Sequence, residues 1–160
     1  MASGAEVVAG LERCGFTHVV WIPDSEVGPW DAALSASRGL RLIRPTREGE
    51  AIAIAGGLQL GGARPLLIFQ CTGLFEAGDS LRNFIHDLKL PLPFIIGLRS
   101  YRAHKAGRSV DTCPVFTEPI LQTWRLPYTL LEPGYSAQQL EDAVKRILAS
   151  GQAGAVVLGE

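Results

Sequence analysis

Two glutamates that follow a short apolar segment could take part in proton transfer. Glu48 and Glu50 come after Thr46 and Arg47, where the apolar segment gives way to an alanine-rich helical pattern. A carboxylate that is removed from water binds its proton more tightly, which suits a group that shares a proton with a ligand. An acidic residue in the first turn of a helix is also stabilised by the helix dipole alone. The spacing therefore leaves a catalytic and a structural role open for Glu48.

A run of basic residues could bind an anionic substrate. The run lies between residues 99 and 112, which is long for a loop in a compact domain, and long loops are often functional. It contains Arg99, Arg102, His104, Lys105 and Arg108. Basic runs commonly form a solvated surface, but a guanidinium at the end of a strand can bind an anionic group through two hydrogen bonds. Both interpretations stay open from the sequence.

Several familiar catalytic and ligand-binding patterns are missing from the sequence. Cys14, Cys71 and Cys113 lack metal-ligand spacing, which predicts reduced thiols in a cytoplasmic protein. Cys71 in particular is expected to be packed and inert. The phosphate-loop, dinucleotide-binding and Gly-x-Ser-x-Gly signatures are also absent, which disfavours the usual nucleotide-binding and hydrolase sites.

Length and composition predict one globular domain. The chain has 160 residues, of which 47% are hydrophobic and 19% are charged. Its formal net charge of −1 provides no overall field to attract nucleic acid or an anionic membrane. No apolar run reaches the roughly 20 residues of a transmembrane helix, and the N-terminal residues show no secretory signal.

Helical and strand-like patterns alternate along the chain, and these elements must position the candidate residues. Strands are expected at 17–22, 40–44, 65–69, 92–98, 128–131 and 155–158, and helices at 6–14, within 26–37, at 48–60, within 76–87, at 114–124 and at 137–149. This alternation predicts a three-layer α/β/α fold with a six-stranded, mainly parallel sheet and a ligand crevice at the carboxyl ends of its strands. Gly56 and Gly57 in the third helix indicate close packing against a neighbour.

Taken together, these segments resemble the pyrimidine-binding domain of thiamine diphosphate enzymes. They are similar to the alpha subunits of sulfopyruvate decarboxylase and to the matching half of phosphonopyruvate decarboxylase. The resemblance covers residues 1–160 as a single domain and centres on the segment from Thr46 to Gly57. In this family a glutamate after the second strand hydrogen-bonds the N1′ atom of the cofactor's aminopyrimidine. Glu48 matches that place, and its distance to Gly57 fits the family's register better than that of Glu50.

The resemblance implies the chemistry of a thiamine diphosphate-dependent 2-oxo acid decarboxylase. Glu48 would favour the form of the aminopyrimidine that takes a proton from the thiazolium ring, which then absorbs the electrons released as carbon dioxide leaves. Gln70, Thr72 and Gly73 would line the cofactor pocket, and Gln70 would also face the substrate. Residues 75–76 depart from the family pattern, because they are phenylalanine and glutamate where relatives often carry glycine and asparagine.

The resemblance implies further contacts with the substrate. Asp24 and Ser25 stand where related decarboxylases place a small polar residue, so either could orient the carboxylate of the oxo acid or shuttle a proton. Either could equally cap the following helix. Arg99 matches a basic residue of the alpha subunits and would bind an anionic group, which favours sulfopyruvate or phosphonopyruvate as the substrate.

The resemblance also implies a partner chain. In this family the diphosphate and its magnesium ion bind another domain, which is marked by Gly-Asp-Gly and by later asparagines. The segment Gly78-Asp79-Ser80 lacks the second glycine of that motif. We therefore expect a beta subunit that holds the diphosphate and Mg²⁺, in a hetero-oligomer with at least two copies of each chain. No metal ligand is expected in this chain.

Other functions compete with the decarboxylase. The same cofactor could serve carboligation or lyase chemistry on an aldehyde, and the sequence does not separate these outcomes. A non-catalytic binding or regulatory module could have kept the fold without the chemistry. A stand-alone enzyme of flavodoxin-like shape would need a site that the sequence does not show.

Overall fold

A six-stranded parallel sheet forms the centre of the molecule. The computed structural model describes residues 2–24 and 27–160. The strands are β1 (His18–Trp21), β2 (Arg41–Ile43), β3 (Pro65–Gln70), β4 (Pro93–Leu98), β5 (Tyr128–Leu131) and β6 (Gly154–Gly159). They lie in the order β2-β1-β3-β4-β6-β5, and each neighbouring pair is parallel. The predicted α/β fold is confirmed, with a sheet that is parallel throughout.

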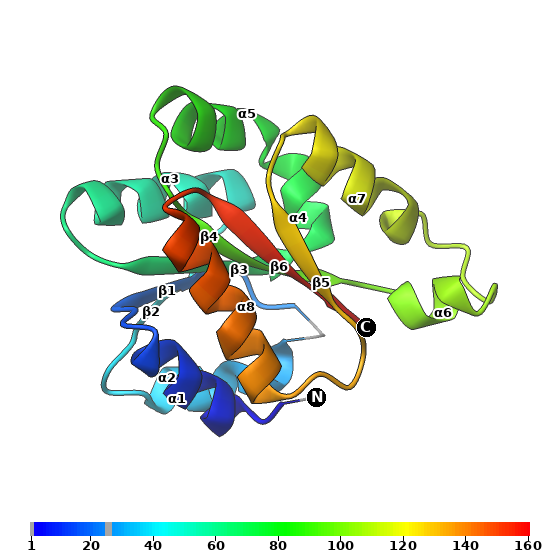
Figure 1. Ribbon diagram of the computed structural model, residues 1–160, viewed down its shortest axis with the longest axis horizontal. Coiled ribbons are helices and arrows are strands. Elements are labelled where there is room, and N and C mark those ends of the chain that lie inside the picture. The colour runs from blue at the N-terminus through cyan, green and yellow to red at the C-terminus, as the bar shows by residue number, and fades with distance from the viewer. Residues whose placement is uncertain (1, 25–26) are drawn as a thin grey trace.

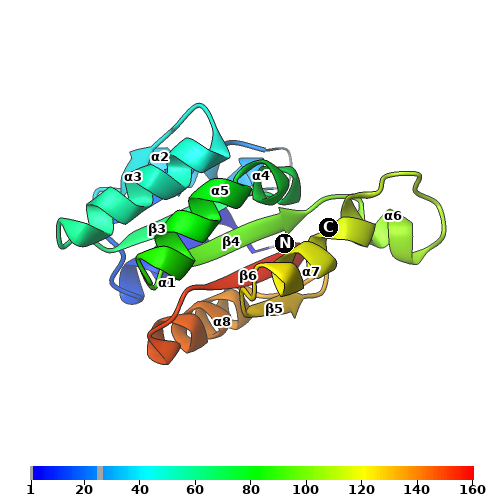
Figure 2. The same cartoon turned by 90° about the horizontal axis from the view of Figure 1, so that it is seen from above.

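Helices cover both faces of this sheet (Figures 1 and 2). The helices are α1 (Gly4–Arg13), α2 (Asp31–Ala36), α3 (Glu48–Leu60), α4 (Cys71–Glu76), α5 (Gly78–Leu81), α6 (Tyr101–Lys105), α7 (Cys113–Thr123) and α8 (Ala137–Ser150), with a 3₁₀ turn η1 (Gly28–Trp30) and a π-helical turn η2 (Arg82–Asp87). One face packs against α1, α2 and α8, and the other packs against α3, α4, α5 and α7.

Alternate residues of each central strand belong to different hydrophobic cores. In β3, Leu66 and Ile68 pack with the layer of α1, α2 and α8, whereas Leu67 and Phe69 pack with the opposite layer. All four side chains are fully buried. Burial on both faces explains why the strands read as nearly continuous apolar runs in the sequence.

Local sequence signals set the ends of two long helices. Ser3 accepts a hydrogen bond from the N–H of Glu6 at the start of α1, and the Glu6 carboxylate accepts one from the N–H of Ser3. Ser136 and Gln139 form the same reciprocal arrangement at the start of α8. Such a capping box pairs two N–H groups that the helix itself leaves unsatisfied.

The basic segment 99–112 is partly helical, which corrects the prediction of a loop. Within it, Tyr101–Lys105 form α6. The Tyr101 hydroxyl and the Lys105 ammonium both donate to Oε1 of Glu132, at 2.8 and 3.0 Å. Glu132 directly follows β5, so this long-range contact attaches α6 to the sheet and stabilises a helix that is too short to be stable alone.

The helix predicted within 76–87 begins earlier than expected, at Cys71. The extended backbone of Gln70, the last residue of β3, leads directly into α4 without a loop. The helical segment is then divided into α4, α5 and η2. This early start places the first turn of α4 at the carboxyl end of β3.

The two adjacent glycines of α3 have different surroundings. A Cβ atom built on Gly56 would lie 2.2 Å from Cδ1 of Phe84, so the close packing predicted there is confirmed. A Cβ atom on Gly57 would meet nothing within 4 Å, so the same prediction is wrong for Gly57. Gly56 faces the η2 segment, whereas the next residue along the helix points away from it.

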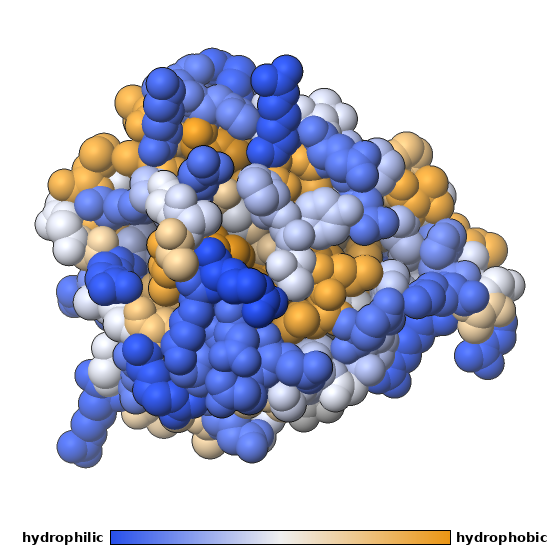
Figure 3. Space-filling view, in the orientation of Figure 1, coloured by the Kyte–Doolittle hydropathy of each residue, from blue (hydrophilic) through white to orange (hydrophobic). Residues whose placement is uncertain are grey.

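The surface differs between the edge strand and its neighbouring helix. All four residues of β5 are half-buried, because β5 has a strand on one side only. Figure 3 shows apolar surface over β5 next to the hydrophilic outer face of α8. Among the helices of the described residues, none is long and apolar enough to cross a membrane.

Candidate active site

The predicted site residues lie at the carboxyl edge of the sheet. β1 and β3 are neighbours, but the chain leaves β1 toward β2 and leaves β3 toward β4. These two connections also lie on opposite faces, through α2 and through α4 and α5. Such a reversal of strand order marks the place where α/β proteins bind their ligands. Asp24, Glu48, Gln70 and Arg99 lie at or beyond the ends of these strands.

Glu48 lies directly against Gly73. Glu48 is the first residue of α3, and Gly73 lies in the first turn of α4. A Cβ atom on Gly73 would be 2.2 Å from Cγ and 2.6 Å from Oε1 of Glu48. The Glu48 side chain therefore occupies space that any other residue at position 73 would fill. Among the described residues, no hydrogen-bond donor reaches the half-buried Glu48 carboxylate, which leaves it available to a donor on a ligand.

Glu50, the competing candidate, is committed to the start of α3. Its Oε2 atom accepts hydrogen bonds from the N–H and the hydroxyl of Thr46, each at 2.8 Å. These bonds lower the pKa of Glu50. A carboxylate that closes the first turn of a helix in this way stabilises the helix. The structure thus gives the two glutamates different surroundings, although their spacing left both open.

Glu76, the last residue of α4, joins α4 to the start of α3, a contact that sequence reasoning missed. Its Oε2 atom accepts a hydrogen bond of 3.0 Å from the N–H of Gly49, and its Oε1 atom lies 3.9 Å from Nε of Arg47. Position 76 departs from the family pattern, and nothing in the local sequence indicates this partner. The contact holds the helix that carries Glu48 against the helix that carries Gly73.

Gln70 and Thr72 lie together at the end of β3. The Thr72 hydroxyl donates to Oε1 of Gln70 at 3.3 Å. Gln70 is half-buried and Thr72 is exposed, whereas Gly73 is buried beneath Glu48. Gln70, the last residue of β3, also pairs in register with Gly97, so it lies beside the carboxyl end of β4. The structure therefore brings Glu48, Gln70, Thr72 and Gly73 to one place.

Arg99 is paired with an acidic residue from the far end of the basic segment. Its Nε atom donates to Oδ2 of Asp111 at 2.8 Å, and the Ser100 hydroxyl donates to the same oxygen at 2.9 Å. Oδ1 of Asp111 accepts from the N–H of Cys113 at 3.0 Å. The Cys113 N–H, the Ser100 hydroxyl and the Arg99 charge lower the pKa of Asp111 to about 2. The sequence showed Arg99 but not the carboxylate that orients it.

Asp24 lies just beyond the end of β1. Its Oδ1 atom accepts a hydrogen bond of 3.0 Å from the N–H of Val27, just before η1. Neither η1 nor α2 has a side-chain cap from a described residue at its start, so Asp24 does not take the helix-capping role that the sequence left open. Ser25, the other candidate at this strand end, lies outside the described residues.

Two buried cysteines lie beneath this edge. Cys71 begins α4 and is fully buried, and Cys113 begins α7 and is 8% exposed. Burial raises the pKa of the Cys71 thiol, and burial together with Asp111 raises that of Cys113 to about 12. Since the thiolate is the reactive form, both residues have the character of packed, unreactive thiols, as expected for Cys71.

The fold is that of a domain found in thiamine diphosphate-dependent enzymes. The chain matches a benzoylformate decarboxylase from Polynucleobacter necessarius with a TM-score of 0.72 and 20% identity, over 99% of this chain and 29% of that one. It matches a thiamine diphosphate-dependent 4-hydroxybenzoylformate decarboxylase from Rhodococcus jostii RHA1 with a TM-score of 0.65 and 19% identity, over 99% and 30%. These matches confirm the predicted fold class.

In sequence, the chain is similar to phosphonopyruvate and sulfopyruvate decarboxylases, which confirms the predicted resemblance. It is 34% identical over 91 residues to the phosphonopyruvate decarboxylase of Streptomyces hygroscopicus, covering 57% of this chain and 23% of that protein. It is 27% identical over 128 residues to the sulfopyruvate decarboxylase subunit alpha of Methanococcus maripaludis, covering 80% of this chain and 76% of that subunit. No protein-family model matches the chain.

The relatives differ in length. This chain spans 23% and 26% of the phosphonopyruvate decarboxylases of Streptomyces hygroscopicus and Streptomyces viridochromogenes. It spans 76% of the Methanococcus maripaludis subunit, which is named as one subunit of its enzyme. The chain therefore corresponds to one part of the longer relatives.

Proposed function

We propose that this chain is the pyrimidine-binding subunit of a thiamine diphosphate-dependent 2-oxo acid decarboxylase. The observation that carries the proposal is the Glu48 carboxylate, which lies against Gly73 at the reversal of strand order and has no hydrogen-bond donor among the described residues. A glutamate in this place can share a proton with a ring nitrogen of the cofactor. The names of the sequence relatives support decarboxylation as the reaction class.

The side chains at this edge fit an aminopyrimidine ring. Glu48 offers a carboxylate for a ring nitrogen, Gln70 offers an amide, and Thr72 offers a hydroxyl. Gly73 leaves the room that Glu48 needs, and Glu76 holds the two helices in register. When bound, thiamine diphosphate supplies the carbon that attacks the 2-oxo group and the ring that takes up the electrons released with carbon dioxide. This chain's part is to bind the pyrimidine and to hold or release a proton at Glu48.

Arg99 is proposed to bind an anionic group of the substrate. Asp111 holds its Nε atom, and the two Nη atoms make no hydrogen bond to the described residues. A guanidinium held from one side presents its other nitrogens as a fork that matches a carboxylate, sulfonate or phosphonate. We therefore propose a 2-oxo acid with a second anionic group, such as sulfopyruvate or phosphonopyruvate. Asp24 and Ser25 are proposed to face its carboxylate.

A partner chain is proposed to complete the cofactor site. The sequence lacks the Gly-Asp-Gly motif of a diphosphate-binding domain, and a relative of similar size is named as a subunit alpha. We propose a beta subunit that holds the diphosphate and Mg²⁺, in a hetero-oligomer with this chain.

The test is cofactor binding to the assembled complex. The chain is co-expressed with a beta-type chain from the same genome that carries Gly-Asp-Gly, and thiamine diphosphate with Mg²⁺ is titrated by calorimetry. Binding is expected for the complex and not for either chain alone. Glu48→Gln is expected to lower decarboxylation by about 10²- to 10⁴-fold, the usual size of a general acid–base contribution.

Glu50→Gln is the matched control, because it removes a carboxylate two residues away that is committed to Thr46. Its activity is expected to stay within about threefold of the parent, since it alters a helix cap and no ligand contact. A well-formed complex that binds no cofactor would contradict the proposal. Unchanged turnover in Glu48→Gln would instead favour a non-catalytic module, and product analysis separates decarboxylation from carboligation.

A further inference from the structure

A second cavity lies at the amino edge of the sheet, opposite the candidate active site. We call it the amino-edge cavity. It has a volume of about 310 Å³ and is lined by Ile85, His86, Lys89, Leu90, Arg125, Leu126, Pro127, Gly151, Gln152 and Ala153. These residues come from η2 and from the turns that precede β4, β5 and β6. None of the candidate active-site residues belongs to this lining.

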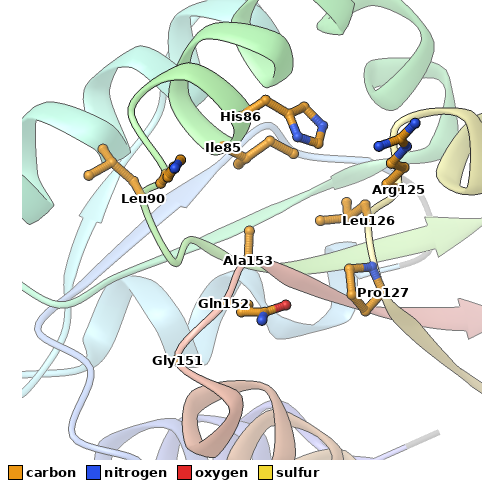
Figure 4. Close-up of a pocket in the computed structure, with 10 residues that line it drawn as sticks. Ile85, His86, Leu90, Arg125, Leu126, Pro127, Gly151, Gln152 and Ala153 are labelled. Carbon is orange, nitrogen blue, oxygen red and sulfur yellow. The ribbon is translucent and has the colours of Figure 1, made fainter.

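The floor of the cavity is apolar. Ile85 and Leu126 are 9% and 3% exposed, and they point toward each other, with Ala153 below them in the view of Figure 4. Leu90 and Pro127 extend this surface on either side. A floor of this kind favours a ligand with a hydrocarbon or aromatic body, because the ligand then removes apolar surface from water.

The titratable side chains of the lining are all basic. They are His86, Lys89 and Arg125, and the lining contains no aspartate or glutamate. Neither Lys89 nor Arg125 forms an ion pair with a described residue, whereas Arg82, close by on η2, is paired with both Asp79 and Asp87. The cavity therefore presents positive charge without an internal counter-ion among the described residues.

The backbone holds both cations in an uncommon conformation. Lys89 and Arg125 have φ angles of 54° and 48°, in the left-handed region that favours glycine. Each follows the end of a helical segment, η2 or α7, where glycine is the usual residue. A lysine and an arginine are therefore conformationally unfavourable in these two places. Both basic residues line one cavity despite a backbone conformation that favours glycine.

His86 has a fixed orientation at the cavity. Its Nε2 atom lies 2.7 Å from the carbonyl oxygen of Trp124, and its ring stacks on the Trp124 indole with centroids 6.4 Å apart. Because a carbonyl oxygen only accepts, Nε2 must carry the hydrogen. The ring is thereby held beside Arg125, on the same side of the apolar floor (Figure 4).

We propose that the amino-edge cavity binds a small organic anion, with a carboxylate or phosphate group between Lys89 and Arg125 and an apolar body on Ile85 and Leu126. The site is distinct from the candidate active site and does not depend on the function proposed for it. A cation after a helix end also offsets the negative end of the helix dipole. Helix stabilisation by these cations requires no ligand, so a measurement of anion binding distinguishes a binding site from a purely structural role.

The test is a titration of the full 160-residue chain, followed by amide chemical shifts in NMR spectra. The probes are phenyl phosphate and benzoate, with benzyl alcohol and benzylamine as neutral and cationic counterparts. Saturable shifts are expected at Leu90, Leu126 and Ala153 for the two anions, and none at Gln70 or Thr72. The tighter of the two anions identifies the ligand as a phosphate or a carboxylate.

Glycine substitutions keep the test interpretable, because glycine relieves the left-handed backbone at both positions. Lys89→Gly and Arg125→Gly are expected to unfold at the same urea concentration as the parent or a higher one. Each should weaken binding of the preferred anion about tenfold or more, since a charged hydrogen bond contributes that much. Lys89→Arg, which keeps the positive charge, should bind the anion about as tightly as the parent. Arg38→Gly, which removes one exposed cation outside this lining, should leave it unchanged.

Three results would overturn the proposal. The first is the absence of saturable shifts with either anion. The second is equal binding of benzylamine, which would show that the apolar floor alone recruits the probe. The third is unchanged affinity in both glycine variants, which would leave the cations as helix-end residues only.

Discussion

The side chain of Glu48 occupies the space that a side chain at Gly73 would need. The two residues are 25 positions apart in the sequence and lie in the first turns of different helices, yet Cγ of Glu48 would be 2.2 Å from a Cβ atom on Gly73. The position of the carboxylate therefore depends on the absence of a side chain at a residue that has no chemistry of its own.

Gly73→Ala is expected to displace Glu48 while leaving the fold intact. Activity of the assembled enzyme should fall about tenfold to a hundredfold, because small displacements of a reacting group have effects of this size. The free energy of unfolding should change by less than about 1 kcal/mol, since alanine is the better helix former and the Glu48 side chain can rotate away. Steady-state kinetics and urea unfolding measure the two quantities.

A double variant tests whether Gly73→Ala lowers activity by moving the Glu48 carboxylate or by some other route. If the alanine acts by moving the carboxylate, Glu48→Gln combined with Gly73→Ala should be no less active than Glu48→Gln alone. Additive losses in the double variant would show that Gly73 acts on the ligand or the fold by another route.

Adjacent glycines in α3 should respond in opposite directions to alanine. Gly56→Ala would place Cβ 2.2 Å from the Phe84 ring, and such overpacking should destabilise the protein by about 1–3 kcal/mol. The Cβ atom of Gly57→Ala would point into open space, and this variant should stabilise the protein by up to about 1 kcal/mol through its higher helix propensity. Urea unfolding of the two variants measures the difference. Equal effects would mean that Phe84 moves aside without cost.

Asp111→Asn should weaken substrate binding more than turnover. The Asp111 carboxylate, with a pKa of about 2, is ionised at neutral pH and holds Nε of Arg99. An amide at this place loses the charge that orients the guanidinium. We expect KM for the anionic 2-oxo acid to rise about tenfold with kcat within about threefold, as for the loss of one charged contact.

The matched control for Asp111→Asn is Asp79→Asn, which removes an exposed carboxylate from the ion pair with Arg82 on η2. Its kinetic constants should match those of the parent. A fall in kcat without a change in KM for Asp111→Asn would contradict the positioning role, because it would indicate an effect on the chemical step.

Acid should destabilise the protein partly through Glu141. This buried carboxylate of α8 accepts hydrogen bonds from Arg13 of α1 and lies 2.7 Å from Nζ of Lys145, and these cations lower its pKa from 4.5 to about 2. Because the pKa of Glu141 is lower in the folded protein, its contribution to the free energy of unfolding is fully present above the pKa of the unfolded chain. That contribution is lost as the pH falls from about 5 toward 2. Urea midpoints at pH 7, 5 and 3 measure this loss.

Glu141→Gln should be less stable than the parent at pH 7, and the difference should shrink at pH 3, because the carboxylate of the unfolded parent is then already protonated. Asp142→Asn changes the neighbouring exposed carboxylate of the same helix and should show a much smaller pH-dependent difference. A constant difference between Glu141→Gln and the parent from pH 7 to pH 3 would contradict the assignment.

The architecture was predictable because its signals are local. The strand at 128–131 and the helix at 48–60 coincide with β5 and α3 at both ends, and the other strands lie within a few residues of the predicted ranges. Strands buried on both faces read as apolar runs, and capping residues such as Ser3 and Ser136 mark helix starts. The order of elements along the chain then favours a parallel sheet with its ligand at the carboxyl edge.

The candidate site was predictable in position and less so in its contacts. The family resemblance placed Glu48, Gln70, Thr72 and Gly73, and the structure brings them together. It also places Arg99 at this edge, but in an ion pair with Asp111 that no spacing rule indicates. The start of α4 at Cys71 was not predicted, because no capping residue or other local signal in the sequence shows that a helix follows β3 without a loop.

The sequence by itself determined the fold class, the order of the strands along the chain and the edge where polar residues gather, because periodicity and capping act over a few residues. The tertiary structure alone decided which carboxylates are committed and which is available. Glu50 is held by Thr46 nearby, but Glu76 reaches Gly49 across 27 residues and Asp111 reaches Arg99 across 12. Those contacts depend on how helices pack around the sheet, and packing is set by the whole chain rather than by any one segment.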